Sequence, residues 1–261
     1  MSLPARLFAP DREEIVDLDS WFEHAPPEKG LPQWKDGYSA KEQARAWLRL
    51  GRPSMPGELY SAVAHFAPDA DEVYGRPEHQ TCLDNYSRAR QHDLFACLRR
   101  DGVMTAAVGI EAKACEGFDG TVGDRAAAGP PSKKRTRCNL LARALFGREV
   151  LDEDSGEVLD AVLGGHGYQL WTAAVGTVIE AQKRELARAV LIVHQFRPQT
   201  LDAPLGAGDK RDWVTALSKN AAAFDAFAAE FAASGSITRQ TEFVKPGTTL
   251  DVVKVESYID A

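Results

Sequence analysis

The chain lacks most of the sequence features that identify zinc proteins, membrane proteins and nucleotide-binding enzymes. Only four of its 261 residues are cysteine, and no two cysteines have the C-x-x-C spacing of a structural zinc site. No apolar run is long enough to span a membrane, and the N-terminal stretch has no apolar signal core. The motifs G-x-G-x-x-G, G-x-S-x-G and H-E-x-x-H and the P-loop are also absent, so no motif supports a small-molecule enzyme.

These absences, together with the composition, predict a cytoplasmic globular protein. With 44% hydrophobic and 26% charged residues, the composition is ordinary for a soluble domain, and we expect reduced thiols and no membrane partner. The net charge of −7 argues against a protein that coats nucleic acid. It does not exclude a nuclease, because phosphate contacts need only a local basic patch.

The order of the predicted elements favours one α/β domain behind an N-terminal arm. Residues 1–38 are rich in proline and turn residues, which predicts an arm anchored by Trp21, Phe22 and Trp34. Residues 39–261 predict a single domain without an internal linker. Periodicity and turn residues predict helices at 39–51, 54–66, 140–146, 166–186 and 212–233, and strands near 80–83, 93–99, 103–114, 189–193, 242–244 and 250–259.

Two acids and a lysine gather at one end of a predicted β-hairpin. In RQHDLFACLRRDGVMTAAVGIEAKACEGF, Asp93 opens the first strand, an Asp-Gly turn follows, and the second strand closes on Glu111-Ala112-Lys113. Because side chains alternate between the two faces of a strand, Glu111 and Lys113 share a face that is otherwise lined by small residues. That face leaves room for a metal ion and a substrate backbone.

The length of the hairpin loop decides whether Asp93 joins the other two residues. A two-residue loop would place Asp93 opposite Ile110, which points to the wrong face. A three-residue loop with a bulge at Gly102 places Asp93 opposite Gly109 and diagonal to Glu111, close enough for a metal ion to bridge the two carboxylates. We therefore predict the three-residue loop.

Two converging carboxylates and a lysine suit metal-assisted hydrolysis of a phosphodiester. Mg²⁺ prefers oxygen ligands and needs only one or two carboxylates, while a lysine ammonium can position the attacking water or stabilise charge on the phosphate. The alternative for Glu111 and Lys113 is a solvated strand face, since a Glu-x-Lys triplet also arises by chance. For Asp93 the alternative is a cap or turn residue.

The hairpin and its neighbours resemble the PD-(D/E)xK, or restriction-endonuclease-like, nuclease superfamily. The order helix, strand, strand, strand, helix, strand over roughly residues 54–196 is similar to the core of that superfamily, which implies a mixed central sheet flanked by helices. The segments RARQHDLF, EAKACEGF and YQLWTAAVGTVIEA are similar to a bacterial family of the superfamily that has no assigned substrate. The proline that often precedes the first acid is replaced by His92.

The resemblance assigns roles to the hairpin residues. It implies that Asp93, Glu111 and Lys113 are catalytic. It also implies that Mg²⁺ or Mn²⁺ is bound by the two carboxylates and by the main-chain carbonyl of Ala112.

Two further residues are candidates for the same site. Some branches of the superfamily add a glutamine from the following helix, here Gln169, whose alternative role is to make local bonds at the start of that helix. Many members also carry an acid on the first helix of the core. Glu58 is preferred for this role by its helical position, and Glu78 and Asp84 compete with it.

The densest positive charge of the chain lies in residues 117–138, which predict a loop. We expect this loop to follow a nucleic-acid backbone, and the alternative is an ordinary solvated loop. The basic residues concerned are Lys133, Lys134, Arg135 and Arg137.

The function expected from the resemblance is a metal-dependent nuclease that acts on DNA. Because many members act as dimers, a homodimer is part of the same expectation. The alternative is a non-catalytic restriction-endonuclease-like module that binds protein or nucleic acid, and the acidic net charge favours it. The intact Asp, Glu and Lys favour the nuclease, because a site that had lost its catalytic activity would not need to keep three costly polar groups together.

Overall fold

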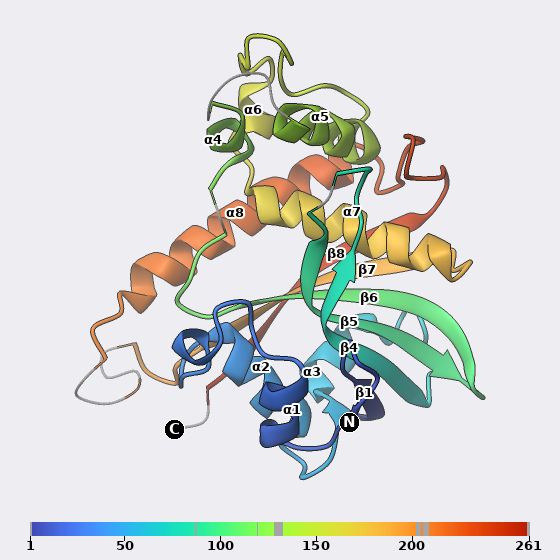
Figure 1. Cartoon of the computed structure of the whole chain (residues 1–261), viewed down its shortest axis with the longest axis vertical. Helices are drawn as coiled ribbons and strands as arrows, with labels where there is room; N and C mark the ends of the chain where they lie inside the picture. Colours follow the sequence, from blue (N-terminus) through green and yellow to red (C-terminus); the bar gives the residue numbers. More distant parts are fainter. Residues whose placement is uncertain are drawn as a thin grey trace.

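The computed structural model describes residues 2–86, 88–118, 120–127, 133–201, 205 and 209–259. Within these residues one mixed sheet of eight strands forms the centre of the molecule, with the order β2-β1-β4-β5-β6-β7-β8 and β3 paired to β1 (Figure 1). The strands are β1 Leu3–Phe8, β2 Glu14–Ile15, β3 Ser54–Met55, β4 Glu72–Thr81, β5 Arg90–Arg100, β6 Val103–Lys113, β7 Arg188–Arg197 and β8 Thr249–Tyr258.

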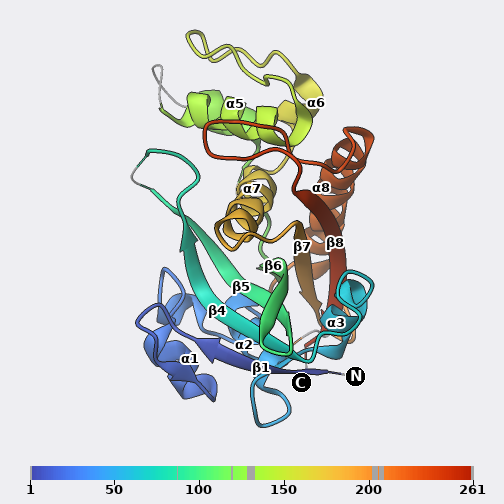
Figure 2. The ribbon, with the colours of Figure 1, turned by 90° about the vertical axis from the view of Figure 1, so that its right-hand side faces the viewer.

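Helices cover both faces of this sheet, as Figures 1 and 2 show. The N-terminal helices lie on one face, and α7 and α8 lie on the other, with α5 stacked beyond α7. The helices are α1 Leu18–His24, α2 Ser39–Leu48, α3 Gly57–Val63, α4 Val122–Ala127, α5 Lys133–Phe146, α6 Ala161–Gly164, α7 Tyr168–Lys183 and α8 Trp213–Ala233, with a short 3₁₀ turn, η1, at Leu31–Gln33.

The two faces of the sheet are buried in two separate hydrophobic cores. Phe95 of β5 belongs to the core on the α7 side, which also contains Trp171 and Phe227, whereas Leu94, its neighbour in sequence, belongs to the core on the α2 side, which contains Trp47. A sheet covered on both faces explains the continuous apolar run of β7, which is parallel to β6 and β8.

The elements predicted as helix, strand, strand, strand, helix, strand occur in this order as α3, β4, β5, β6, α7 and β7, and the helices α4, α5 and α6 are inserted between β6 and α7. The strands β4, β5 and β6 form an antiparallel meander, and α7 then carries the chain to β7, which is parallel to β6. No helix in the described part of the chain is long and apolar enough to cross a membrane.

The prediction that residues 1–38 form an arm outside the domain is wrong. Strand β1 lies within the sheet and pairs in parallel with β4, and Trp21 is buried at 2% exposure in the core on the α2 side. The cause is visible in LPARLF, where buried and exposed residues alternate with the period of a strand.

Three local predictions also need correction. The first core strand is β4 at 72–81 rather than 80–83, because Gly75 and Pro77 disguise it. The predicted loop at 117–138 contains α4 and the first turns of α5, and its residues 119 and 128–132 lie outside the described part. Residues 242–244 are not a strand, since the chain turns there before β8.

Helix α7 packs closely on β6 at Gly109. A Cβ at this position would overlap the side chain of Thr177, whose hydroxyl donates to the carbonyl of Ala173 one turn earlier. The glycine therefore sets the distance between α7 and the strand that carries Glu111.

Replacing this glycine tests the packing. We expect Gly109→Ala to lower the free energy of unfolding by about 1–3 kcal/mol, because the added methyl displaces α7, and urea titration measures this. The matched control is Gly165→Ala, where the nearest atoms are 3.5 Å away and the change should stay within about 0.5 kcal/mol. Adding Thr177→Ala should recover part of the loss; equal stability of the two glycine variants would contradict the packing argument.

Candidate active site

The register of the β5–β6 hairpin differs from the sequence prediction, but it still brings Asp93 next to Glu111. The turn is a two-residue one, with φ of +49° at Asp101 and +80° at Gly102, between the paired residues Arg100 and Val103. The predicted three-residue loop is therefore wrong. The register instead shifts by one between Leu98 and Arg99, because β6 carries an extra residue, a β-bulge.

This bulge brings Asp93 and Glu111 together. Beyond it the register runs to the pair Leu94–Ile110, so the next residues, Asp93 and Glu111, are direct cross-strand neighbours. The two strands separate at this point, and the Asp93 side chain takes over the ladder bond: its Oδ2 accepts from the Ala112 N–H at 2.7 Å. The carboxylates meet where β5 and β6 fork.

Two cations hold the Glu111 carboxylate inside this fork. Lys113 Nζ donates to Oε1 at 2.6 Å, and the guanidinium of Arg90, at the start of β5, pairs with Oε2. Glu111 is 1% exposed and Lys113 5% exposed. The Lys113 ammonium also lies over the ring of Phe118, 5.4 Å from its centroid. Sequence reasoning missed Arg90, which carries no motif.

A third acid, Glu78 of β4, stands opposite Asp93 on its other side. It falls between the pairs Pro77–Leu94 and His79–His92, and its φ of +52° is in the left-handed region, unusual for a residue with a side chain. Its Oε2 accepts from the amide of Gln91. Glu78 is therefore the acid that joins the hairpin residues.

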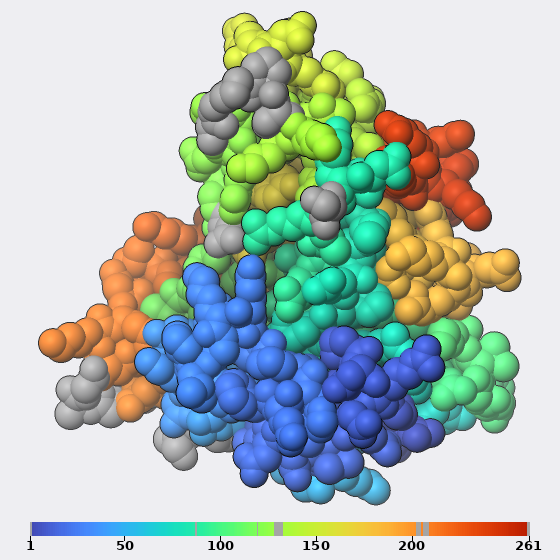
Figure 3. All heavy atoms as spheres, viewed as in Figure 1, coloured from blue at the N-terminus to red at the C-terminus, as the bar shows by residue number. Residues whose placement is uncertain are grey.

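The segment that carries Glu78 and Asp93 projects away from the N-terminal layer. Figure 2 shows the β4–β5 end reaching beside α7 toward α5. In Figure 3 the blue N-terminal segment forms one end of the visible face and the green to yellow α4–α6 region the other, with the teal segment of β4 and β5 between them.

Electrostatic crowding in the cluster is visible in the pKa values. Burial and the charge of Asp93 raise the pKa of Glu78 to about 9, and burial and the charge of Glu111 raise the pKa of Asp93 to about 7. Burial alone would raise the pKa of Glu111, but Arg90 and Lys113 outweigh it and lower that pKa. Glu78 therefore keeps its proton at neutral pH, and the carboxyl groups of Asp93 and Glu111 share the two cations.

The lysine itself stays protonated. Burial alone would lower the pKa of Lys113, but the charges of Glu111 and Asp93 outweigh burial and raise it. Lys113 therefore acts as a fixed positive charge at neutral pH.

The oxygens at the fork fit a small divalent cation in their chemistry. Mg²⁺ takes oxygen ligands and needs one or two carboxylates, which Asp93 and Glu111 supply. The Ala112 carbonyl is on the same side of β6 as its N–H, the side that faces Asp93. No group of three or more His, Cys, Asp or Glu side chains in the described residues is arranged to hold a metal, and both Glu111 oxygens already face cations.

Two buried amides fix the end of β6 beyond Lys113. Gln195 of β7 donates to the carbonyls of Lys113 at 3.2 Å and Ala114 at 2.7 Å. Asn220 of α8 donates to Gln195 Oε1 and to the carbonyl of Glu116, both at 3.0 Å. Single amides in a strand and a helix give no sequence signal, so sequence reasoning missed both.

The remaining acid candidates lie elsewhere. Glu58 of α3 is on the other face of the sheet, where it accepts from Arg49 at 2.6 Å and Ser257 at 2.7 Å. Asp84 pairs with Arg137 at 2.6 Å. Neither acid joins the cluster at the fork.

Gln169 stands in the first turn of α7, the helix that packs on the Glu111 face of β6. It is half-buried, and its carbonyl accepts from the Thr172 hydroxyl at 3.0 Å. The structure thus keeps Gln169 on the face that carries the cluster.

The predicted basic patch divides into two kinds of residue. Arg135 is 5% exposed and donates to the carbonyls of Ala126 and Asp154, and Arg137 is held by Asp84. These two arginines secure the α5 region, whereas Lys133 and Lys134 are exposed at its start.

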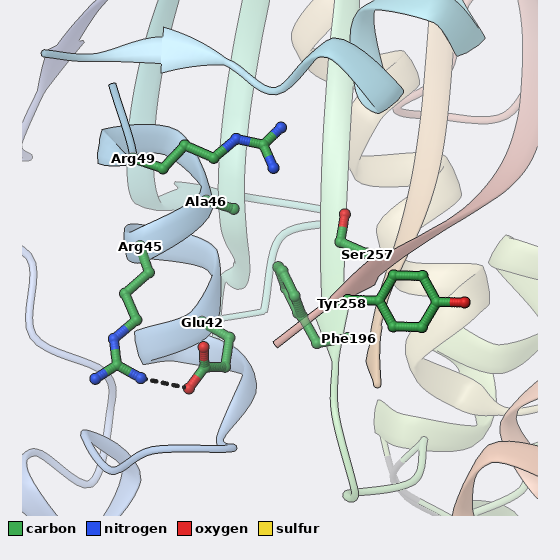
Figure 4. Close-up of a pocket in the computed structure, with 7 residues that line it drawn as sticks. All are labelled: Glu42, Arg45, Ala46, Arg49, Phe196, Ser257 and Tyr258. Carbon is green, nitrogen blue, oxygen red and sulfur yellow. Dashed lines mark hydrogen bonds and ion pairs between the residues drawn. The ribbon is translucent and has the colours of Figure 1, made fainter. Parts of the chain in front are cut away.

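A small hollow beside α2, drawn in Figure 4, is separate from the fork. Its charged groups are already paired: Glu42 accepts from Arg45 at 3.0 Å and from the Gly37 N–H at 2.7 Å. Ser257, at its wall, hydrogen-bonds His194 at 2.7 Å and Glu58. The hollow is lined by Glu42, Arg45, Ala46, Arg49, Phe196, Ser257 and Tyr258.

The raised pKa of Glu78 predicts a pH-dependent stability. Between its ordinary value of 4.5 and about 9, folded Glu78 keeps a proton that the unfolded chain releases, so stability falls as pH rises. We expect Glu78→Gln to make this decline shallower, by at most about 1.4 kcal/mol per pH unit, in urea titrations from pH 5 to 8.

The matched control is Glu58→Gln. The pKa of Glu58 is lowered, so this residue affects stability only as pH falls below its ordinary value, and the slope between pH 6 and 8 should not change. Equal slopes for wild type and Glu78→Gln would show that Glu78 does not carry the extra proton.

A sequence profile for a protein family described as "Domain of unknown function (DUF6946)" matches residues 14–258. Comparisons with curated proteins and with solved structures gave no significant match. The matched region contains Glu78, Arg90, Asp93, Glu111 and Lys113, and with them the whole cluster at the fork. The chain belongs to the family described as a domain of unknown function, DUF6946.

Proposed function

We propose that this protein is a metal-dependent nuclease that hydrolyses phosphodiester bonds of DNA. The observation that carries the proposal is the convergence of Asp93, Glu111 and Lys113 where β5 and β6 separate. The three residues come from two strands, with Glu111 and Lys113 buried and Asp93 half-buried, an arrangement that is costly for the fold unless it serves chemistry.

The arrangement of elements around the cluster also supports a restriction-endonuclease-like core. The order α3, β4, β5, β6, α7, β7, with α4, α5 and α6 inserted between β6 and α7, is compatible with the core of the superfamily resembled by the sequence. The antiparallel meander followed by a parallel strand places the acids at the carboxyl end of β6. This end of β6 is where the proposal puts the substrate phosphate.

Each residue has a distinct role in the proposed reaction. Asp93, Glu111 and the Ala112 carbonyl would hold Mg²⁺ or Mn²⁺, which when bound polarises a phosphate and a water molecule. Lys113 keeps its proton, so it stabilises developing negative charge and orients the water rather than acting as a base. Gln195 and Asn220 keep the Lys113 backbone in place.

A second candidate is a non-catalytic module that binds protein or nucleic acid. The specific observation in its favour is that both Glu111 oxygens already pair with cations, Lys113 and Arg90. In that reading the cluster is a closed ion-pair network. The convergence of Asp93 on the same end of β6 as Glu111 and Lys113 favours the nuclease.

Cleavage of supercoiled plasmid tests the proposal. With Mg²⁺ or Mn²⁺ we expect nicking that EDTA abolishes, and we expect Glu111→Gln and Lys113→Met to reduce it at least about 100-fold, because each removes charge at the reacting phosphate. Glu58→Gln, on the opposite face, is the matched control and should keep wild-type activity. Single-stranded DNA and RNA substrates in parallel define the nucleic acid.

Two results would contradict the nuclease. One is that the folded wild-type protein cleaves none of these substrates with either metal. The other is that Glu111→Gln cleaves as fast as wild type. Absence of cleavage together with absence of a metal-induced thermal shift would select the binding module.

A further inference from the structure

We propose that Arg90 is a resident counterion of the site, which competes with the divalent cation for Glu111 until a substrate phosphate draws it away. This inference rests on the proposed nuclease function and adds a regulatory step to it. Metal and nucleic acid would then bind cooperatively. The phosphate draws Arg90 away from Glu111, and a metal ion bound to Glu111 leaves Arg90 free to bind the phosphate.

The position of Arg90 is the first support. It is the first residue of β5 and is the cross-strand partner of Thr81, the last residue of β4. From there its side chain, 10% exposed, reaches Glu111 on β6 and covers one carboxylate oxygen. Lys113 covers the other oxygen, so a divalent ion at Glu111 would meet two positive charges.

The incomplete bonding of Arg90 is the second support. Its Nε is buried and has no hydrogen-bond partner among the described residues. A buried donor without a partner costs free energy, and Lys113 already neutralises Glu111. The ion pair is therefore not needed to neutralise Glu111, and a better acceptor can replace it.

A phosphate diester is that better acceptor. The guanidinium is a planar fork whose donors match two phosphate oxygens, and such charge-assisted pairs are among the strongest hydrogen bonds in proteins. Asp93 and Glu111 remain at the fork when Arg90 leaves, so these two carboxyl groups then face a single cation, Lys113. The negative charge released in this way favours the divalent ion.

The competing view is that Arg90 is a structural ion pair between β5 and β6. The two views predict opposite changes in metal affinity. Removing a structural pair loosens the fork and weakens metal binding, whereas removing a competitor strengthens it. Arg99 provides a matched control, because it lies on the same strand and pairs with Glu72 at 2.9 Å, far along β5 from the cluster.

The experiment measures Mn²⁺ binding to the full chain by calorimetry, without nucleic acid. We expect Arg90→Gln to bind Mn²⁺ about tenfold more tightly than wild type, and Arg99→Gln to bind as wild type does. Arg90→Lys, which keeps the charge but not the fork, should stay near wild type and serves if Arg90→Gln does not fold. Thermal melting monitored by circular dichroism checks the fold of each variant.

A second measurement tests the coupling to the phosphate. A short phosphorothioate-substituted DNA duplex that resists cleavage should raise the Mn²⁺ affinity of wild type about tenfold and leave that of Arg90→Gln unchanged. Equal or weaker Mn²⁺ binding by folded Arg90→Gln overturns the inference, as does an equal effect of the duplex on both proteins.

The outcome is separable from that of the proposed function. If wild type cleaves plasmid but Arg90→Gln binds Mn²⁺ no more tightly than wild type, the proposed role of Arg90 is wrong and the nuclease proposal stands. If Arg90→Gln binds Mn²⁺ more tightly but wild type cleaves no substrate, the competition between Arg90 and the metal ion stands and the nuclease proposal is wrong.

Discussion

One extra residue in β6 determines the geometry of the whole cluster. The hairpin turn alone would leave Asp93 facing Ile110 across the strands, with its carboxylate on the opposite face from Glu111. The register shift between Leu98 and Arg99 moves every later pair by one residue, and the two acids become neighbours. The bond from the Ala112 N–H to Asp93 then replaces the ladder bond lost where the strands part.

The cluster that this register creates is expensive for the fold. Carboxyl groups from three adjacent strands lie close enough to affect one another. Burial raises the pKa of both Glu78 and Asp93, and repulsion adds to it, from Asp93 on Glu78 and from Glu111 on Asp93. A left-handed backbone at Glu78 adds local strain. Proteins retain such costs where charge is used, and the strands and two hydrophobic cores around the fork supply the stability to hold it.

Sequence reasoning recovered the elements whose signal is local. The Glu111-x-Lys113 face follows from the period of a strand, and α7 and α8 follow from long helical patterns. The β-bulge has no local signal, because its residues are ordinary for a strand. Glu78 and Arg90 join the site only through strand pairing, which the sequence does not display, and Arg135 reads as a surface cation although it is buried among carbonyls.

The amide pair formed by Gln195 and Asn220 connects α8 to the cluster at the fork, although the helix contributes no charged group to it. One carboxamide connects three polypeptide segments that are remote in sequence, since it binds the exit of β6 and receives a bond from α8. The long helix thereby supports, through a single side-chain bond, the main chain from which the Lys113 ammonium extends.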